Sequence, residues 1–510
     1  MNNVPAILRL LIIYVVCAVL AIIVGCELTD PLTYSTFAVV GIIALILVFP
    51  LLLRWHYPLL LFAWSTNITL FFIKGMPTVW LALVVLSLGI SIMHRALSKD
   101  MHFIRVPQIT WSLICMIGVV VVTAELTGGF GLRTFHSEIY GGRKYIFLLV
   151  GILSYFALTA QRIPANRIRL YVTLFFLGGV TSFISDLFPI APSWSYFVFW
   201  LFPPSPLNSY TFELGQTRLG GFSAAGVALW CLLMAIYGIR GIFLSRKWWR
   251  LAVFILSISL IFLGGYRGAL ITVGAIFVLQ FFMEGLHRTK LLLVFALFGA
   301  LVFTTMIPFA SKLPFTVQRT LAFLPLKLDP AARLSAQDTL NWRIEMWKAL
   351  LPQVPRHLFL GKGFAITPED YEMMGWNSPF QTVDASQQGL ALSYDYHNGP
   401  LSVLIPFGIF GAIGFLWFLV AGLRVMYCNF RYGDPSLRIY NTFLFADFFI
   451  TFLIFFIGGG LATDMMRFAG FVGLSIAING GVRRPPKTTA PSPQFGKIQN
   501  PTNLQPSPAG

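Results

Sequence analysis

Apolar runs, each about as long as a bilayer is thick, constrain this chain more than any other feature. A transmembrane helix needs about 20 predominantly apolar residues. We count about 14 candidate runs, near residues 7–25, 33–53, 57–73, 77–93, 109–126, 145–161, 170–188, 221–239, 249–265, 268–284, 290–308, 399–424, 440–457 and 460–479. Because a Gly-rich break at 264–268 could lie within one unit, 12–14 separate spans are expected. The sequence predicts an all-α polytopic integral membrane protein.

Composition excludes a water-soluble protein, and it decides how the net positive charge is interpreted. Hydrophobic residues make up 57% of the 510 residues and charged residues only 11%. The net charge of +17 would suggest nucleic acid in a soluble protein. In a membrane protein it is typical of cytoplasmic Lys and Arg that fix orientation. We therefore expect membrane lipids as neighbours and no nucleic-acid partner.

One long polar interruption divides the chain. With a cytoplasmic N-terminus, 21 of the 36 Lys and Arg residues fall on inside links, and only 7 fall on short outside links and rims. This topology predicts transmembrane helices 1–11 in residues 1–308, an extracytoplasmic loop domain in 309–396 and helices 12–14 in 397–479. Residues 480–510 have the composition of a disordered cytoplasmic tail.

Two shorter patterns stand inside the loop. Apolar residues at helical spacing from Leu340 to Leu351 predict an amphipathic helix on the membrane rim or over a cavity, ended by Pro352. Leu358-Phe-Leu-Gly-Lys-Gly-Phe364 is interpreted as a turn close to the lipid. Phosphate binding by its two glycines is the weaker alternative.

Cysteine usage and the first apolar run add two expectations. The five cysteines are scattered singly, without CxxC or a histidine at ligand spacing, so we expect neither a disulfide framework nor a metal site. We also expect no cofactor. The run from about Ile7 to Val24 lacks a cleavage signal and is interpreted as a retained helix.

Four ionisable side chains at the predicted outer boundary are candidates for chemistry: Arg218, Arg267, Arg343 and His397. An arginine near a helix centre costs on the order of 2.5–3.5 kcal/mol on insertion scales, and less near the interface. Guanidinium groups offer paired donors to phosphate oxygens, so two or three of them would hold a diphosphate. Histidine is suited to accept a proton from a hydroxyl group near neutral pH.

Structural roles for these and other charges remain open alternatives. An interfacial arginine can be a membrane anchor, and a histidine before Asn-Gly can belong to a helix cap. Asp447 is expected to pair with a neighbouring helix. Asp464 and Arg467, three residues apart, are interpreted as an ion pair. Asp186 near an outer rim is ambiguous.

Four ordered motifs carry a family resemblance. They are Arg218-Leu-Gly-Gly-Phe222, Tyr266-Arg-Gly-Ala269, Asn341-Trp-Arg-Ile-Glu-Met-Trp347 with Leu360-Gly-Lys-Gly-Phe364, and His397-Asn398 at the start of a span. In order, spacing and predicted topology the set resembles the O-antigen ligase and polymerase superfamily of bacterial envelopes. The resemblance covers roughly Thr217 to Leu416.

The resemblance implies a metal-independent, inverting glycosyltransferase of the bacterial inner membrane, and the distribution of Lys and Arg predicts that both termini are cytoplasmic. Such proteins take a glycan from a polyprenyl diphosphate and pass it to an acceptor hydroxyl. Carried over by motif, Arg218 and Arg267 would bind the diphosphate and His397 would be the base. Arg343 would complete the clamp, with Arg319 and Arg333 as alternatives. Tyr266 stands where the family often has Ser or Thr.

The acceptor and the class of function stay open at this point. The acceptor would be a growing glycan for a polymerase or the lipid A core for a ligase, and the long loop slightly favours a polymerase. A flippase that transports lipid-linked glycans is the alternative from another class. Clustering of the arginines beside one large loop is evidence against transport. The two classes separate on product chemistry, since a transporter leaves glycosidic linkages unchanged.

Overall fold

The computed structural model describes residues 6–27, 34–73, 75–98, 102–130, 141–204, 219–364 and 394–483. Within these ranges the chain is mostly helical and has no β-strand, which confirms the predicted all-α class. The longer helices are α1 (Ala6–Glu27), α2 (Tyr34–Ala63), α3 (Val79–Leu97), α4 (Pro107–Leu126), α5 (Gly142–Leu158), α10 (Gly220–Phe243), α11 (Trp248–Leu263), α12 (Arg267–Met283), α13 (Leu291–Phe309), α15 (Pro330–Leu350), α19 (Gly399–Tyr432), α20 (Arg438–Gly458) and α21 (Leu461–Asn479). Shorter helices are α6 (Ile168–Leu177), α7 (Phe183–Asp186), α8 (Val198–Leu201), α14 (Phe315–Thr320) and α16 (Gln353–Arg356).

The described residues contain eight helices long and apolar enough to cross a membrane. A ninth is reached if the pair within α2, bent by 89° near Pro50, counts as one span. This count is lower than the 12–14 spans that the apolar runs predicted. The predicted break at 264–268 does separate two helices, but α11 and α12 have only 16 and 17 residues. The run predicted near 170–188 is built of short helical pieces that together form one of the eight candidate spans, Ala165–Asp186.

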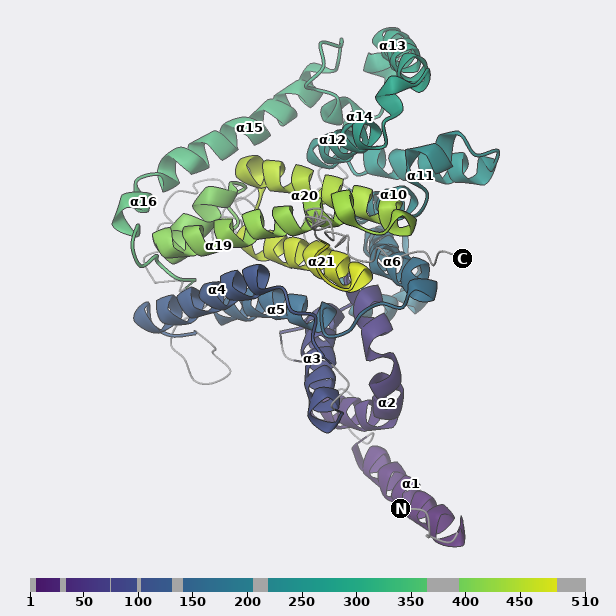
Figure 1. Ribbon diagram of the computed structural model, residues 1–510, viewed down its shortest axis with the longest axis vertical. Helices are drawn as coiled ribbons and strands as arrows, with labels where there is room; N and C mark the ends of the chain where they lie inside the picture. The colour runs from purple at the N-terminus through teal and green to yellow at the C-terminus, as the bar shows by residue number, and fades with distance from the viewer. Residues whose placement is uncertain are drawn as a thin grey trace, which may run out of the picture.

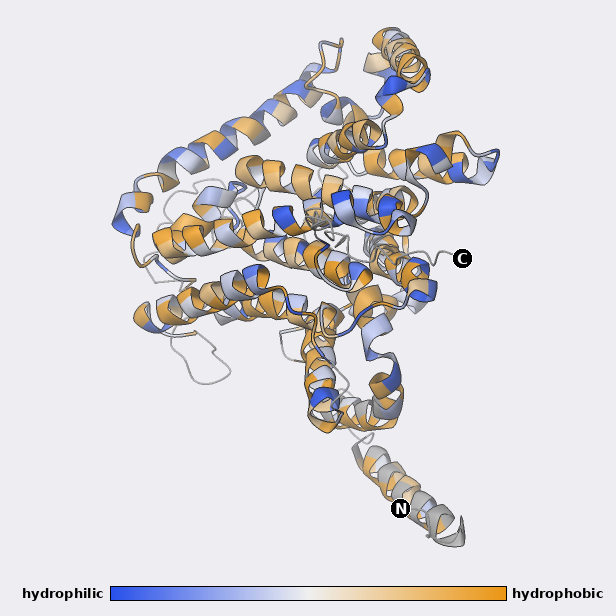
Figure 2. Cartoon of the chain, viewed as in Figure 1, coloured by the Kyte–Doolittle hydropathy of each residue, from blue (hydrophilic) through white to orange (hydrophobic). Residues whose placement is uncertain are grey.

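Three C-terminal helices form the centre of the molecule (Figure 1). Helix α19 packs against α20 and α4, and α21 packs against α5. The aromatic side chains of Phe418, Phe448 and Phe468, one from each central helix, are fully buried. On the other side of this centre α10 packs against α11, α6 and α20. Figure 2 shows α13 as almost continuously apolar, and no side chain of α13 is buried.

Helix α15 confirms the helix predicted in the loop and begins ten residues earlier than predicted. Asp329 is its N-cap, accepting a hydrogen bond from the Ala331 amide at 2.8 Å, and Pro330 occupies the first turn. Polar and apolar residues alternate along its length (Figure 2). Leu340 and Ile344 are exposed, whereas Trp347 packs on the core. The helix therefore lies over the bundle rather than in it.

A kink in α19 receives the glycine-containing turn of the loop. Gly408 has φ 61° and ψ −161°, so the helix is interrupted there, and a Cβ at this position would collide with backbone oxygens of the turn. The Lys362 amide donates to the Ile405 carbonyl at 2.8 Å and the Gly363 amide to the Pro406 carbonyl at 2.9 Å. These amides are engaged with α19. The turn therefore docks the loop on α19. Its amides are already used in these hydrogen bonds, so they are not available to bind a phosphate.

One fully buried carboxylate in the central helices is paired across helices. Arg467 of α21 donates from Nη2 to Asp447 Oδ1 of α20 at 2.6 Å, and Asp447 is fully buried. This pair confirms the expected partner for Asp447 on a neighbouring helix. Asp464, expected to pair with Arg467, accepts a hydrogen bond from the Gly460 amide at 3.0 Å and acts on Arg467 as a second nearby negative charge. Its position in the first turn of α21 favours that cap.

Candidate functional site

His397 stands in a strained turn immediately before α19. Its φ is 48°, a left-handed conformation that is uncommon for a residue with a side chain. Asp395 Oδ1 accepts a hydrogen bond from the His397 amide at 3.2 Å. The N-cap of α19 is Asn398, whose Oδ1 accepts from the Leu401 amide at 3.1 Å. Because Asn398 carries out the capping, the cap does not use the imidazole of His397.

Asp395 also lies beside the imidazole ring. Its Oδ1 is 3.9 Å from His397 Nδ1, and both side chains are about a third exposed or less. The carboxylate packs against Gly460, where a Cβ would collide with it. A carboxylate held in this way can orient a neighbouring imidazole and stabilise its protonated form. Asp395 is therefore a functional candidate that we did not identify from the sequence.

Helix α15 fixes the same turn from the opposite side. Trp347 Nε1 donates to the Tyr396 carbonyl at 2.8 Å, and the Tyr396 amide donates to Ser402 Oγ at 3.1 Å. The ring of Trp342 meets the ring of His397 edge to face, with centroids 6.2 Å apart. Since residues four apart share a helix face, Arg343 lies on the same face of α15 as Trp347. The docking of α15 thus brings Arg343 to the histidine.

Arg343 and Arg267 lie close enough for their positive charges to interact, and among the described residues Asp395 opposes that effect on Arg343. Arg343 is half-buried, and its Nε atom is buried with no hydrogen-bond partner in the described part of the chain. Burial lowers the pKa of Arg343, and the positive charge of Arg267 lowers it further, against the opposing effect of Asp395. Arg267 is the first residue of α12, so the positive end of that helix dipole adds to the same field. Such a place attracts an anion.

The imidazole of His397 is held toward its neutral form. Burial lowers its pKa below the ordinary value of 6.5, and Arg343 lowers it further. Asp395 and a hydrogen bond with the backbone of Gly458 act in the opposite direction without cancelling the effect of burial. A neutral imidazole at neutral pH is the form that can accept a proton.

Arg218 lies outside the described residues, but the residues that follow it are described. A Cβ on Gly220 would stand 3.3 Å from the hydroxyl of Tyr266, next to Arg267. The start of α10 therefore lies beside the start of α12. Asp186, ambiguous in the sequence, accepts a hydrogen bond from the Phe222 amide at 2.8 Å and so caps α10.

The two alternative loop arginines have different surroundings from Arg343. Arg333 donates from Nη2 to the Leu326 carbonyl. Arg319 belongs to α14 and is 8% exposed. Neither appears among the charges that shift the pKa of Arg343 or His397. Of the predicted site residues, the structure brings Arg267, Arg343 and His397 into one electrostatic cluster.

Metal-ligating side chains do not gather in the described ranges, where no group of three or more His, Cys, Asp or Glu residues could hold an ion. The cluster offers instead two guanidinium groups, one imidazole and one carboxylate. Asp395 carries the clearest signal that could have been found from sequence, because it stands two residues before His397 in one polar turn. The contact of Trp342 depends on docking of the loop and has no such local signal.

Comparison with known proteins finds a family match. Residues 252–416 match the family model described as O-antigen ligase. The matched segment includes Arg267, Arg343, Asp395 and His397 and begins after Arg218. No curated protein matches the chain.

The match confirms the resemblance to the O-antigen ligase and polymerase superfamily that the motifs indicated. Glycan transfer, with lipid-linked glycan and lipid A-core as substrates, is the general activity of O-antigen ligases. Together with the membrane-spanning helices, the match indicates a bacterial membrane protein that transfers glycans.

Proposed function

We propose that this membrane protein, matched to O-antigen ligase over residues 252–416, transfers a glycan from a polyprenyl diphosphate to an acceptor hydroxyl group. The observation that carries the proposal is the placement of two guanidinium groups beside a histidine held toward its neutral form. Like charges repel, so an anion bound between Arg267 and Arg343 would reduce the repulsion between them. A diphosphate supplies that charge and accepts paired hydrogen bonds from arginine.

The proposed reaction uses His397 as the base. The neutral imidazole accepts the proton of the acceptor hydroxyl, and the acceptor oxygen forms a bond to the anomeric carbon. The bond between that carbon and the diphosphate oxygen breaks, and its electron pair leaves with the diphosphate. Attack opposite the leaving group inverts the anomeric centre. Asp395 stabilises the imidazolium that forms.

The arginines would act on the leaving group. Negative charge develops on the bridging oxygen as the diphosphate departs, and fixed cations at that place lower the barrier. Arg267 and Arg343 are the described candidates, and the start of α10 places the segment that follows Arg218 at the same site. With two or three guanidinium groups on the diphosphate, the step has no need of a metal ion.

The location and the acceptor are further parts of the proposal. We place the loop and this site on the outer face of the bacterial inner membrane, with both termini cytoplasmic, because the Lys and Arg residues of the short links favour that orientation. The acceptor hydroxyl belongs to a glycan in a polymerase and to the lipid A core in a ligase.

The test is a reconstituted assay with a polyprenyl-diphosphate-linked oligosaccharide. Arg267→Ala is expected to reduce transfer by roughly 10²–10³-fold, as for loss of a donor that stabilises developing charge. Arg288→Ala, which removes an exposed arginine beyond the opposite end of α12, is the matched control and should keep full activity. A chelator should leave the wild-type rate unchanged. Product size distinguishes a polymerase from a ligase.

Two results would contradict the proposal. Equal activity of Arg267→Ala and Arg288→Ala would remove Arg267 from the site. Movement of the lipid-linked glycan between leaflets with its linkages intact would show transport instead of transfer.

A further inference from the structure

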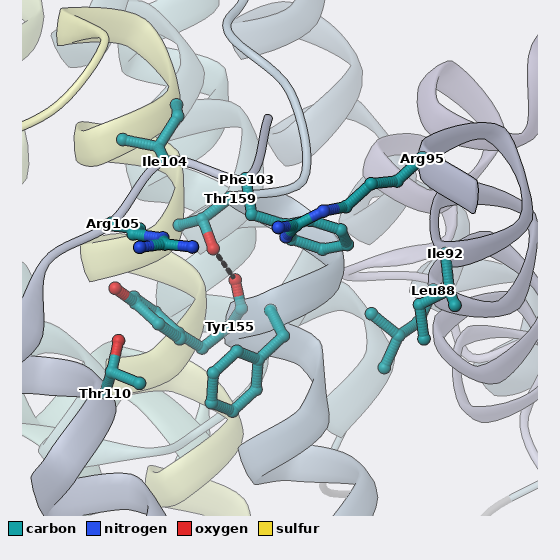
Figure 3. A pocket seen from close by; sticks show the side chains of 10 residues that line it. Leu88, Ile92, Arg95, Phe103, Ile104, Arg105, Thr110, Tyr155 and Thr159 are labelled. Carbon is teal, nitrogen blue, oxygen red and sulfur yellow. Dashed lines mark hydrogen bonds between the residues drawn. The ribbon is translucent and has the colours of Figure 1, made fainter. Parts of the chain in front are cut away.

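A cavity far from the cluster of Arg267, Arg343 and His397 opens where α3, α4 and α5 meet. Its volume is about 350 Å³, and side chains of α3, of the link between α3 and α4, and of α5 line it (Figure 3). Both α3 and α4 are candidate membrane spans, so the link between them lies at a membrane boundary. The Ile104 amide donates to the Thr159 carbonyl at 3.0 Å, which holds this part of the link on α5.

The cavity combines an apolar wall with two positive charges. Leu88, Ile92 and Phe156 supply the wall, and Ile92 is 55% exposed at its edge. Arg95 lies over the ring of Phe103 at 5.5 Å, and the side chain of Arg105 approaches from the other side (Figure 3). None of the ten lining residues is acidic. The charge on this wall therefore has no counterion among the residues that form the cavity.

Two hydroxyl groups lie together at the base of the cavity. The Tyr155 side chain is 1% exposed, and its hydroxyl is buried. The hydroxyl of Thr110 stands beside it on the same wall (Figure 3).

We propose that this cavity binds an anionic phospholipid, with its phosphate between Arg95 and Arg105 and the start of its acyl chains along Leu88 and Ile92. Arginine binds phosphate oxygens through paired donors, and apolar wall next to cations matches the order of groups in a phospholipid. Cationic pockets between helices at the membrane surface bind such head groups. A soluble phosphate would meet the cations and leave the apolar wall uncovered.

The test measures lipid binding to the purified full-length protein by native mass spectrometry. Phosphatidylglycerol and phosphatidylcholine with the same acyl chains are titrated in one detergent. The variant Arg95→Gln/Arg105→Gln should bind phosphatidylglycerol roughly 25-fold more weakly, at about 1 kcal/mol for each basic side chain near the surface. The control Arg167→Gln/Arg246→Gln removes the same charge from two exposed arginines outside the cavity and should bind as the wild type does.

A second variant tests the position of the lipid without changing charge. Ile92→Trp places a larger side chain at the exposed edge of the cavity, so it should weaken phosphatidylglycerol binding while the protein keeps its fold. Inorganic phosphate and glycerol phosphate at millimolar concentration should not displace the lipid. Displacement by either would overturn the lipid as occupant. Equal loss in the control double variant, or equal binding of both lipids to the wild type, would overturn the site.

Discussion

Two arginines of this molecule differ in how their charge is compensated. Arg467 in the central helices donates to the fully buried Asp447 at 2.6 Å and so has a carboxylate of its own. Arg343 on α15 has Arg267 as a neighbouring charge, shares Asp395 with His397, and has a buried Nε atom without a partner in the described ranges. The first arrangement is complete within the chain. The second, among the described residues, has one carboxylate for two guanidinium groups and an imidazole, and we propose that a bound anion completes it.

Arginines that look alike in the sequence can therefore have different roles, one in the stability of the fold and the other in the proposed chemistry. A buried ion pair is kept because breaking it exposes one charge to an apolar interior. Two cations beside one carboxylate repel each other when no substrate is bound, and a bound diphosphate would offset that repulsion and accept their hydrogen bonds. Substitutions should therefore affect stability at Arg467 and catalysis at Arg267, Arg343 and His397.

The largest effect is expected at His397. His397→Ala should lower the transfer rate by roughly 10²–10⁴-fold, because the acceptor hydroxyl loses its base. Thermal unfolding should change little, since Asn398 and not His397 caps α19. The measurement is single-turnover transfer in proteoliposomes, with the exposed His102→Ala as control. A variant that keeps more than half of the wild-type rate would contradict the role of His397 and leave the site without a base.

Arg467 should give the opposite result. Arg467→Ala leaves the Asp447 carboxylate buried without its cation, at a cost of about 3–5 kcal/mol in the free energy of unfolding. Denaturant unfolding in detergent measures it. The double variant Asp447→Leu/Arg467→Met removes both charges and should recover most of that loss. If Arg467→Ala were as stable as the wild type while losing transfer, Arg467 would belong to the site and the comparison would fail.

A smaller loss is expected at the kink of α19. Gly408→Ala puts a Cβ on a residue at φ 61° and against the backbone of the docked turn, which should cost about 1–3 kcal/mol. The loop would then detach from α19, so proteolysis between α15 and α19 should become faster and transfer slower. Gly118→Ala in α4, where a Cβ meets nothing within 4 Å, is the control. Unchanged proteolysis would show that the turn does not hold the loop.

Sequence reasoning reached the helical membrane class, the helix at 340–351 and the family resemblance, because each rests on a local pattern of residues. Its 12–14 spans compare with eight helices of sufficient length and apolar composition in the described residues, and run length alone does not show that α2 bends near Pro50 or that α11 is short. It misplaced the partner of Arg467, because spacing within one helix carries no information about α20. It also missed Asp395, although this residue stands two positions before His397 in one polar turn; only the packing of its carboxylate against Gly460 has no local signal.

The smallest and sharpest test is the pH dependence of transfer. His397 acts as a base when neutral, so kcat/KM should rise with pH through its pKa, and burial puts that rise below pH 6.5. Asp395 raises the pKa of His397, so Asp395→Asn should move the rise to lower pH. Arg343 lowers the same pKa, so Arg343→Gln should move the rise to higher pH and also raise KM for the lipid diphosphate. Arg288→Gln should move neither. Loss of fold or of expression cannot shift the rise to lower pH in one variant and to higher pH in the other. Opposite shifts would therefore establish that the charges of Arg343 and Asp395 both act on His397. Shifts of the same sign would exclude it.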